Sequence, residues 1–268
     1  MTGRVAGKVA FVTGAGRGLG RSHAIRLAEE GAEIIAVDTC KEYDTVAYPG
    51  TTPEDLAQTV AAVEALGRRI VAIQADVRDA QALGTAVADG VARLGRLDIV
   101  VANAAICTMQ NWDEVTPVIW QDTIDTNLTG VWNTMMAAAP HLVAAGSGSV
   151  ICIGSTAGVR GLRFLTPYVV AKHGVVGLVK AMANELGRYR IRVNVVHPGG
   201  VNTPMGTALM DLGAALSKGA GTGPISRNAL PVQISEPLDI SNAVLYLASD
   251  ESANVTGHEI IVDAGATI

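Results

Sequence analysis

Seven short, almost continuous apolar runs recur along the chain, and longer stretches with helical spacing separate them. The runs are rich in Val and Ile, which is typical of strands buried on both faces of a parallel sheet. They cover residues 8–13, 32–38, 69–76, 97–104, 149–155, 191–198 and 259–265. This alternation predicts a single α/β domain over residues 1–268: a doubly wound parallel sheet of about seven strands with helices on both faces.

Two segments interrupt the alternation. Residues 39–52 form a polar passage where a short link to the next helix is expected, and residues 202–235 form another irregular stretch. Loops of more than about 12 to 15 residues are uncommon in compact domains and are usually functional or disordered. We therefore expect these two segments to carry what is specific to this chain, with a disordered surface loop as the alternative for 39–52.

Composition narrows the class of protein. Hydrophobic residues make up 49% and charged residues 17%, as in a folded globular protein. A net charge of −5 offers no basic surface for nucleic acid or an anionic membrane. No run has the roughly 18 apolar residues of a membrane-spanning helix, and the N-terminal run is too short for a signal peptide. We expect a cytoplasmic protein with no nucleic-acid or membrane partner.

The cysteines and histidines show no metal-binding spacing. Cys40, Cys107 and Cys152 are far apart and form no CxxC pair, so we expect three reduced thiols. The five histidines are scattered, and no metal site is expected.

A glycine-rich turn follows the first apolar run. Residues 13–20 read TGAGRGLG and lead into a helical stretch. Backbone N–H groups and the positive end of a helix dipole make such a turn an anion site, here for a pyrophosphate. Asp38 ends the second run at the spacing expected for an acid on the adenosine ribose. The segment therefore predicts a Rossmann-like dinucleotide site.

Asp38 also favours NAD over NADP. Its carboxylate can accept hydrogen bonds from ribose hydroxyls but repels a 2′-phosphate, at a cost on the order of 4 kcal/mol at about 4 Å separation. Arg17 in the turn could instead pair with a 2′-phosphate or lie at the surface near the pyrophosphate. We give Asp38 more weight because it lies where the ribose must sit.

Tyr168 and Lys172 are four residues apart in a helical stretch, so their side chains share one face. A nearby lysine cation is expected to lower the tyrosine pKa towards the neutral range in which a general acid/base works best. Ser155 ends an apolar run and should lie where ligands bind in open α/β sheets, although a strand-end serine is also a common helix or turn cap. Asn127 lies in a helical stretch, where it could hold a water that links Lys172 to solvent, or serve only a local backbone group.

In this order and spacing the motifs resemble the short-chain dehydrogenase/reductase family over essentially the whole chain. The matching elements are the turn from Thr13 to Gly20, Asp76 and Val77, Asn103 and Ala104, Asn127, Ser155, the Tyr168/Lys172 pair, and Pro198 and Gly199 with Thr203. The resemblance implies hydride transfer between NAD and an alcohol or carbonyl. It makes Tyr168 the acid/base, Lys172 its partner and a ribose ligand, Ser155 the substrate-oxygen ligand, and Asn127 a relay residue.

The resemblance also implies a set of cofactor contacts. Asp76 and Val77 would flank the adenine, and Val201 and Thr203 the carboxamide. At Ala105 the family usually has Gly, so a methyl group crowds that contact. The full set is Gly14, Arg17, Gly18, Leu19, Asp38, Asp76, Val77, Asn103, Ala104, Ala105, Tyr168, Lys172, Val201 and Thr203.

Residues 202–235 occupy the substrate-lid position of the family. Their apolar face consists of Met205, Leu209, Met210, Leu212 and Leu216, without an Arg cluster for a carboxylate or phosphate. We expect a small apolar, cyclic or terpenoid, carveol-like secondary alcohol, or its ketone, as substrate. A lid helix that simply packs on the core is the alternative for this face.

Two other functions compete with an alcohol dehydrogenase. A 3-oxoacyl-type or other ketone reductase of the same family typically prefers NADP, so Asp38 counts against it. A non-catalytic dinucleotide sensor would be expected to lose Tyr168 or Lys172, and this chain keeps both. Residues 120–139 and 169–186 have wide apolar faces that could equally pack within the subunit. In the family these helices pair across subunits, so the resemblance implies a homotetramer.

The insertion of residues 39–52 resembles the mycofactocin-coupled, carveol-dehydrogenase-like subfamily. That resemblance implies NAD held so tightly that it scarcely exchanges, and reoxidation by a peptide-derived redox carrier, mycofactocin. Because the insertion starts directly after Asp38, we expect it to cover the adenosine, with Tyr43, Tyr48 or Cys40 packed on the adenine.

Shortening residues 41–51 should therefore make NAD exchangeable while Tyr168 chemistry remains. The measurement is the nucleotide content of the purified protein before and after dialysis. Unchanged retention in the shortened protein would contradict the covering role.

Overall fold

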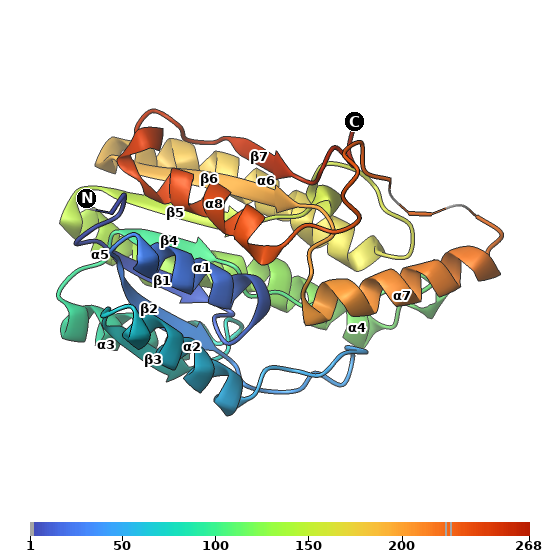
Figure 1. The fold of residues 1–268 in the computed structure, drawn as a ribbon, viewed down its shortest axis with the longest axis horizontal. Helices are drawn as coiled ribbons and strands as arrows, with labels where there is room; N and C mark the ends of the chain where they lie inside the picture. The colour runs from blue at the N-terminus through green and yellow to red at the C-terminus, as the bar shows by residue number, and fades with distance from the viewer. Residues whose placement is uncertain (1–2, 223, 226) are drawn as a thin grey trace.

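Seven parallel strands form the sheet at the centre of the computed structural model, which describes residues 3–222, 224–225 and 227–268 (Figure 1). The strands are β1 (Val9–Thr13), β2 (Glu33–Asp38), β3 (Ile70–Gln74), β4 (Ile99–Ala102), β5 (Gly148–Ile153), β6 (Ile191–Pro198) and β7 (Glu259–Val262). Their order is β3-β2-β1-β4-β5-β6-β7. Each strand lies within one of the apolar runs, except that β5 begins one residue before its run, so the predicted fold class is confirmed.

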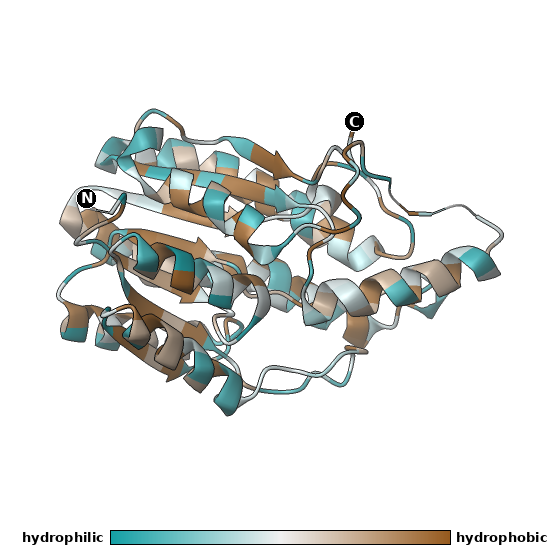
Figure 2. Cartoon of the chain, in the orientation of Figure 1, coloured by the Kyte–Doolittle hydropathy of each residue, from teal (hydrophilic) through white to brown (hydrophobic). Residues whose placement is uncertain are grey.

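Helices cover both faces of the sheet (Figure 1). One face packs against α1 (Gly18–Glu29), α2 (Pro53–Ala65) and α8 (Pro237–Ala248), and the other against α3 (Ala80–Leu94), α5 (Gly130–Ala145) and α6 (Thr166–Leu186). Successive residues of β1 alternate between the two layers, with Phe11 in the α3/α5/α6 core and Val12 in the α1/α2/α8 core. Apolar residues accordingly fill the strands, and the outer helices carry the hydrophilic ones (Figure 2).

The carboxyl ends of the strands form the functional edge of the molecule. β1 pairs with β2 on one side and β4 on the other, so the strand order reverses beside β1, which is where ligands bind in open α/β sheets. The 39–52 insertion, α4 (Pro117–Ile124) and α7 (Pro204–Gly219) all lie beyond this edge (Figure 1).

The two segments that interrupt the alternation differ in structure. All of residues 39–52 are described, and none is in a helix or strand, as expected. The 202–235 segment instead contains α7, which Thr203 caps by accepting a hydrogen bond from the Gly206 N–H at 3.0 Å. Residues 223 and 226 of that segment lie outside the described residues.

Within the described ranges, no helix combines the length and apolar character needed to cross a membrane.

Two glycines of α3 give a matched test of the packing between α3 and the sheet. A Cβ added at Gly90 would lie 2.7 Å from the side chain of Ile35 on β2, whereas one added at Gly84 meets nothing within 4 Å. Gly84→Ala should stabilise the protein by about 0.5–1 kcal/mol because alanine is the better helix former. Gly90→Ala should destabilise it by about 1–2 kcal/mol because overpacking outweighs that gain. Thermal unfolding of the two variants checks this, and equal melting shifts would contradict it.

Candidate active site

A cleft of about 510 Å³ lies at the carboxyl ends of the strands. It runs from the glycine turn and the end of β2, past the ends of β4 and β5, to α6 and α7. Every residue expected to contact the cofactor lines it, together with Ser155, Tyr168 and Lys172. Of the predicted site residues, only Asn127 is not part of its wall.

The glycine turn has no room for a side chain at Gly14 or Gly20. Gly14 has a φ of +65°, and a Cβ there would lie 2.9 Å from the Cα of Ala104. A Cβ on Gly20 would lie 1.9 Å from the Gly14 oxygen. Asn103 closes the contact, because its amide donates to the Thr13 carbonyl oxygen at 2.9 Å. The turn is therefore fixed against the end of β4, and its backbone borders the cleft.

Asp38 ends β2 at the wall of this turn. It is 4% exposed, and its carboxylate accepts hydrogen bonds from the Gly16 N–H at 2.9 Å and the Cys40 N–H at 3.1 Å. This arrangement fixes an acid beside the pyrophosphate turn, which suits ribose hydroxyls and disfavours a 2′-phosphate. Arg17, which could have favoured NADP, donates to the Pro49 carbonyl oxygen of the insertion.

Ser155, Tyr168 and Lys172 meet at the other half of the cleft. Ser155 follows β5, and its hydroxyl oxygen accepts a hydrogen bond from the Ala157 N–H at 3.1 Å, so it is also the turn cap that the sequence allowed. Tyr168 and Lys172 share a face of α6, with the lysine Nζ 5.5 Å from the centre of the tyrosine ring. Lys172 is 1% exposed and donates to the Ile153 carbonyl oxygen at 2.8 Å.

Comparison with known proteins identifies the family. A family model for short chain dehydrogenases matches residues 8–211. The chain belongs to the short-chain dehydrogenase family. It is 45% identical over 274 residues to (-)-trans-carveol dehydrogenase of Rhodococcus erythropolis, covering 99% of each chain. It is 40% identical to trans-4-hydroxycyclohexanecarboxylate dehydrogenase of Sinomonas cyclohexanicum, covering 98% of this chain and 94% of that one.

A solved structure supports the cofactor. The carveol dehydrogenase of Mycobacterium avium in complex with NAD superposes with a TM-score of 0.91 at 48% identity, covering 99% of each chain. This short-chain dehydrogenase is accordingly an NAD-dependent oxidoreductase, as the sequence predicted.

The pKa values of Tyr168 and Lys172 both depart from their usual range, and the direction for Tyr168 differs from the expectation. Burial raises the pKa of Tyr168, with Cys107 adding to the rise and the Ser155 hydroxyl opposing it. Burial also lowers the pKa of Lys172 from 10.5 to about 8. The expected lowering of the Tyr168 pKa is therefore wrong for the protein alone, because desolvation by burial is the largest effect on both groups.

Asn127 takes a supporting position. It lies in the π-turn Asp125–Thr129 between α4 and α5 and is completely buried. Its side-chain oxygen accepts from the Ile106 N–H at 2.8 Å, and its amide donates to the Ile106 oxygen at 2.7 Å. Asn127 thus holds the segment after β4, and its part in a proton relay stays a prediction.

His197 is a supporting residue that the sequence did not indicate. Its Nδ1 lies 2.7 Å from the Ser155 carbonyl oxygen, and its Nε2 lies 3.2 Å from the Glu259 carboxylate. Glu259 also pairs with Lys180 at 2.8 Å. β6 and β7 thereby fix the backbone that carries Ser155. An isolated histidine before Pro198 gives no spacing signal from which this could be read.

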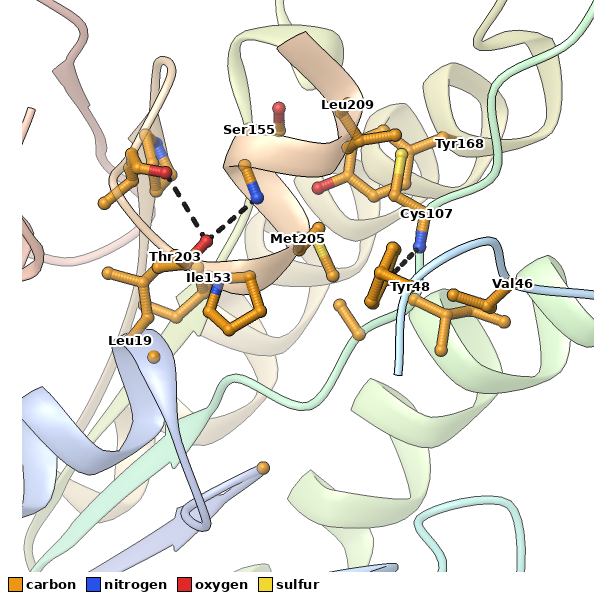
Figure 3. Close-up of a pocket in the computed structure, with 18 of the residues that line it drawn as sticks. Leu19, Val46, Tyr48, Cys107, Ile153, Ser155, Tyr168, Thr203, Met205 and Leu209 are labelled. Carbon is orange, nitrogen blue, oxygen red and sulfur yellow. Dashed lines mark hydrogen bonds between the residues drawn. The ribbon is translucent and has the colours of Figure 1, made fainter. Parts of the chain in front are cut away.

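The insertion spans the length of the cleft, which corrects part of the adenine prediction. Tyr43 lies at the expected end, with the Arg78 guanidinium 4.7 Å over its ring and Asp76 beside it. Cys40 packs against the α1/α2/α8 core and does not line the cleft. Tyr48 lies at the opposite end, where its hydroxyl accepts from the Cys107 N–H at 3.0 Å (Figure 3). Of the three alternatives, Tyr43 is therefore the one that lies beside Asp76 at the expected adenine end.

The cleft beyond Tyr168 is apolar. Tyr168 packs in a cluster with Cys107, Met109, Leu165 and, from α7, Met205, Leu209, Leu212 and Leu216. Four of the five predicted lid residues thus pack in this cluster, while Met210 is 40% exposed and lines the cleft. The apolar face of α7 therefore packs on the core of the protein and also borders the cleft.

In the described part of the chain, no group of three or more His, Cys, Asp or Glu side chains is placed to hold a metal ion.

The lowered pKa of Lys172 predicts a pH-dependent stability. Between about 8 and 10.5, Lys172 is mostly neutral in the folded protein and charged in the unfolded one, so the unfolded state binds more protons. Stability from this group therefore rises with pH across that window. Across this pH window, the free energy of unfolding of the wild type should rise by up to about 3 kcal/mol more than that of Lys172→Met. Denaturant unfolding of both proteins at several pH values measures this, and a pH-independent difference would contradict it.

Proposed function

We propose that the protein interconverts a small apolar secondary alcohol, cyclic or terpenoid and carveol-like, with its ketone, using Tyr168 as acid/base. The observation that carries the proposal is the position of Tyr168. It lies beside Ser155 at the boundary between the dinucleotide half of the cleft and the apolar cluster of α6 and α7.

The residues of the dinucleotide half fit NAD. Backbone N–H groups of the glycine turn would hold the pyrophosphate, and Asp38 the adenosine ribose. Asp76 and Val77 would flank the adenine, and Val201 with Thr203 the carboxamide; all four line the cleft. NAD would supply the acceptor for the hydride when bound, and Lys172 would hold its second ribose.

The protein side chains handle the proton. The Ser155 oxygen accepts a hydrogen bond from the Ala157 N–H, and its hydroxyl, which interacts with Tyr168 in the protein alone, would turn to the substrate oxygen. Tyr168 then takes the hydroxyl proton during oxidation or gives it back during reduction. Since burial raises the Tyr168 pKa, the deprotonated form that oxidation needs grows as the pH increases. Oxidation is therefore expected to become faster towards alkaline pH.

The pocket walls favour an uncharged substrate. Among the described residues around the apolar cluster, Lys172 is the only lysine or arginine that lines the cleft, and it is bonded to Ile153. A bound carboxylate or phosphate would have no cation other than this buried lysine to pair with there, which counts against a charged 3-oxoacyl thioester. The relative that is named for a hydroxycyclohexanecarboxylate makes charged ring alcohols a natural comparison set.

We further propose that the insertion retains NAD and that mycofactocin or a similar peptide-derived carrier reoxidises it. The insertion is tied to both sides of the cleft: Arg17 of the glycine turn donates to Pro49, and Thr45 donates to Asp122 of α4 at 2.9 Å. A loop fixed at two points across the adenosine end would slow dissociation without touching the nicotinamide.

We also propose that the protein assembles as a homotetramer in the cytoplasm. Trp112 is 81% exposed, and Trp120, Trp132 and Val170 of α4, α5 and α6 are also exposed. Large apolar side chains on neighbouring helices are typical of a subunit interface. Three free cysteines suit a reducing compartment.

Tyr168→Phe tests the catalytic role. The variant keeps the ring and its packing but has no proton to exchange, so turnover should fall by at least about 100-fold. The nucleotide bound to the purified protein is first identified by releasing it from a separate sample. Oxidation of carveol and cyclohexanol is then measured with an artificial electron acceptor. Full turnover by the variant would contradict the mechanism. Turnover of charged thioesters alone by the wild type would contradict the substrate class.

A further inference from the structure

Tyr48 belongs to an insertion that begins at the adenosine end of the cleft, yet its side chain ends beside the catalytic tyrosine. It is 9% exposed, and its hydroxyl accepts the Cys107 N–H at 3.0 Å. Cys107 is 2% exposed and packs in the same apolar cluster as Tyr168. Figure 3 shows the Tyr48 hydroxyl directed at Cys107, in the space that Tyr168, Met205 and Leu209 also line.

The electrostatics of Tyr168 independently place Tyr48 nearby. Burial is the main cause of the raised Tyr168 pKa, and Cys107 and Tyr48 both add to it. Tyr43, five positions earlier in the same insertion, instead interacts with Asp76, Arg78 and Asp122. The insertion therefore has an adenosine end and an active-site end.

We propose that Tyr48 is a specificity-determining residue of the substrate pocket. Its ring forms one wall of the space in front of Tyr168, and the hydrogen bond from the Cys107 N–H holds the ring in place. This inference rests on the proposed alcohol dehydrogenase activity. The insertion then limits substrates to compact alicyclic alcohols, in addition to covering the cofactor.

The surroundings of Tyr48 keep this wall of the pocket uncharged. Burial raises the pKa of Tyr48, so the hydroxyl stays neutral and offers no charge to the pocket. A flat neutral ring held by one buried hydrogen bond selects by shape and apolar contact. Loss of the ring opens space, and loss of the hydroxyl leaves the Cys107 N–H unpaired and the ring unanchored.

The test uses Tyr48→Ala, Tyr48→Phe and, as a matched tyrosine at the adenosine end, Tyr43→Phe. The readout is the ratio of kcat/KM for menthol to that for cyclohexanol, which compares a substituted ring with the bare one. We expect the ratio to rise by at least about tenfold in Tyr48→Ala and by a smaller factor in Tyr48→Phe. It should stay at the wild-type value in Tyr43→Phe. NAD content after dialysis is measured in parallel.

The outcomes separate this inference from the function on which it rests. If Tyr48→Ala still oxidised alcohols with the wild-type ratio, the role of Tyr48 as a pocket wall would be wrong, while the proposed dehydrogenase activity would be unaffected. An equal rise in Tyr43→Phe, or a rise only in variants that lose NAD, would also overturn it, because general loosening of the insertion would then explain the change. A wild-type protein that oxidises no alcohol would refute the proposed function and the inference together.

Discussion

The close packing of the glycine turn against the end of β4 is the contact on which the rest of the site depends. Gly14 lies against the backbone of Ala104, and the Asn103 amide ties the two strand ends together. A side chain at Gly14 or Gly20 would separate them. Because β1 lies where the strand order reverses, this contact sets where the cleft opens. It also sets how far Asp38 lies from Tyr168.

Burial is the second constraint, and it acts on Tyr168 and Lys172. Desolvation favours the neutral forms of both groups, although the Lys172 Nζ lies 5.5 Å from the centre of the Tyr168 ring. The protein nevertheless holds Ser155 in place through His197 and fixes Lys172 on the Ile153 carbonyl. These two contacts fix the positions of Ser155 and Lys172 at the wall of the cleft.

Much of this could be predicted from sequence because the signals are local. Strand runs, the glycine turn and a tyrosine–lysine pair on one helix face each depend on residues close together in the chain. Contacts between distant segments could not be predicted. Nothing in the sequence near Tyr48 indicates that it reaches Cys107, and nothing near Asn127 indicates that both of its amide atoms are used by Ile106. The Tyr168 pKa was misjudged for the same reason, since burial depends on the whole fold.

We propose that alcohol oxidation occurs in this cleft on an NAD that stays bound. The most direct measurement is a single-turnover experiment in which carveol is mixed with purified protein without added nucleotide, while the absorbance of reduced nicotinamide is followed. We expect reduced nicotinamide in an amount equal to the bound NAD, with further turnover only after an artificial electron acceptor is added. Reduction that occurs only when free NAD is supplied would show that the cofactor exchanges and that this proposal is wrong.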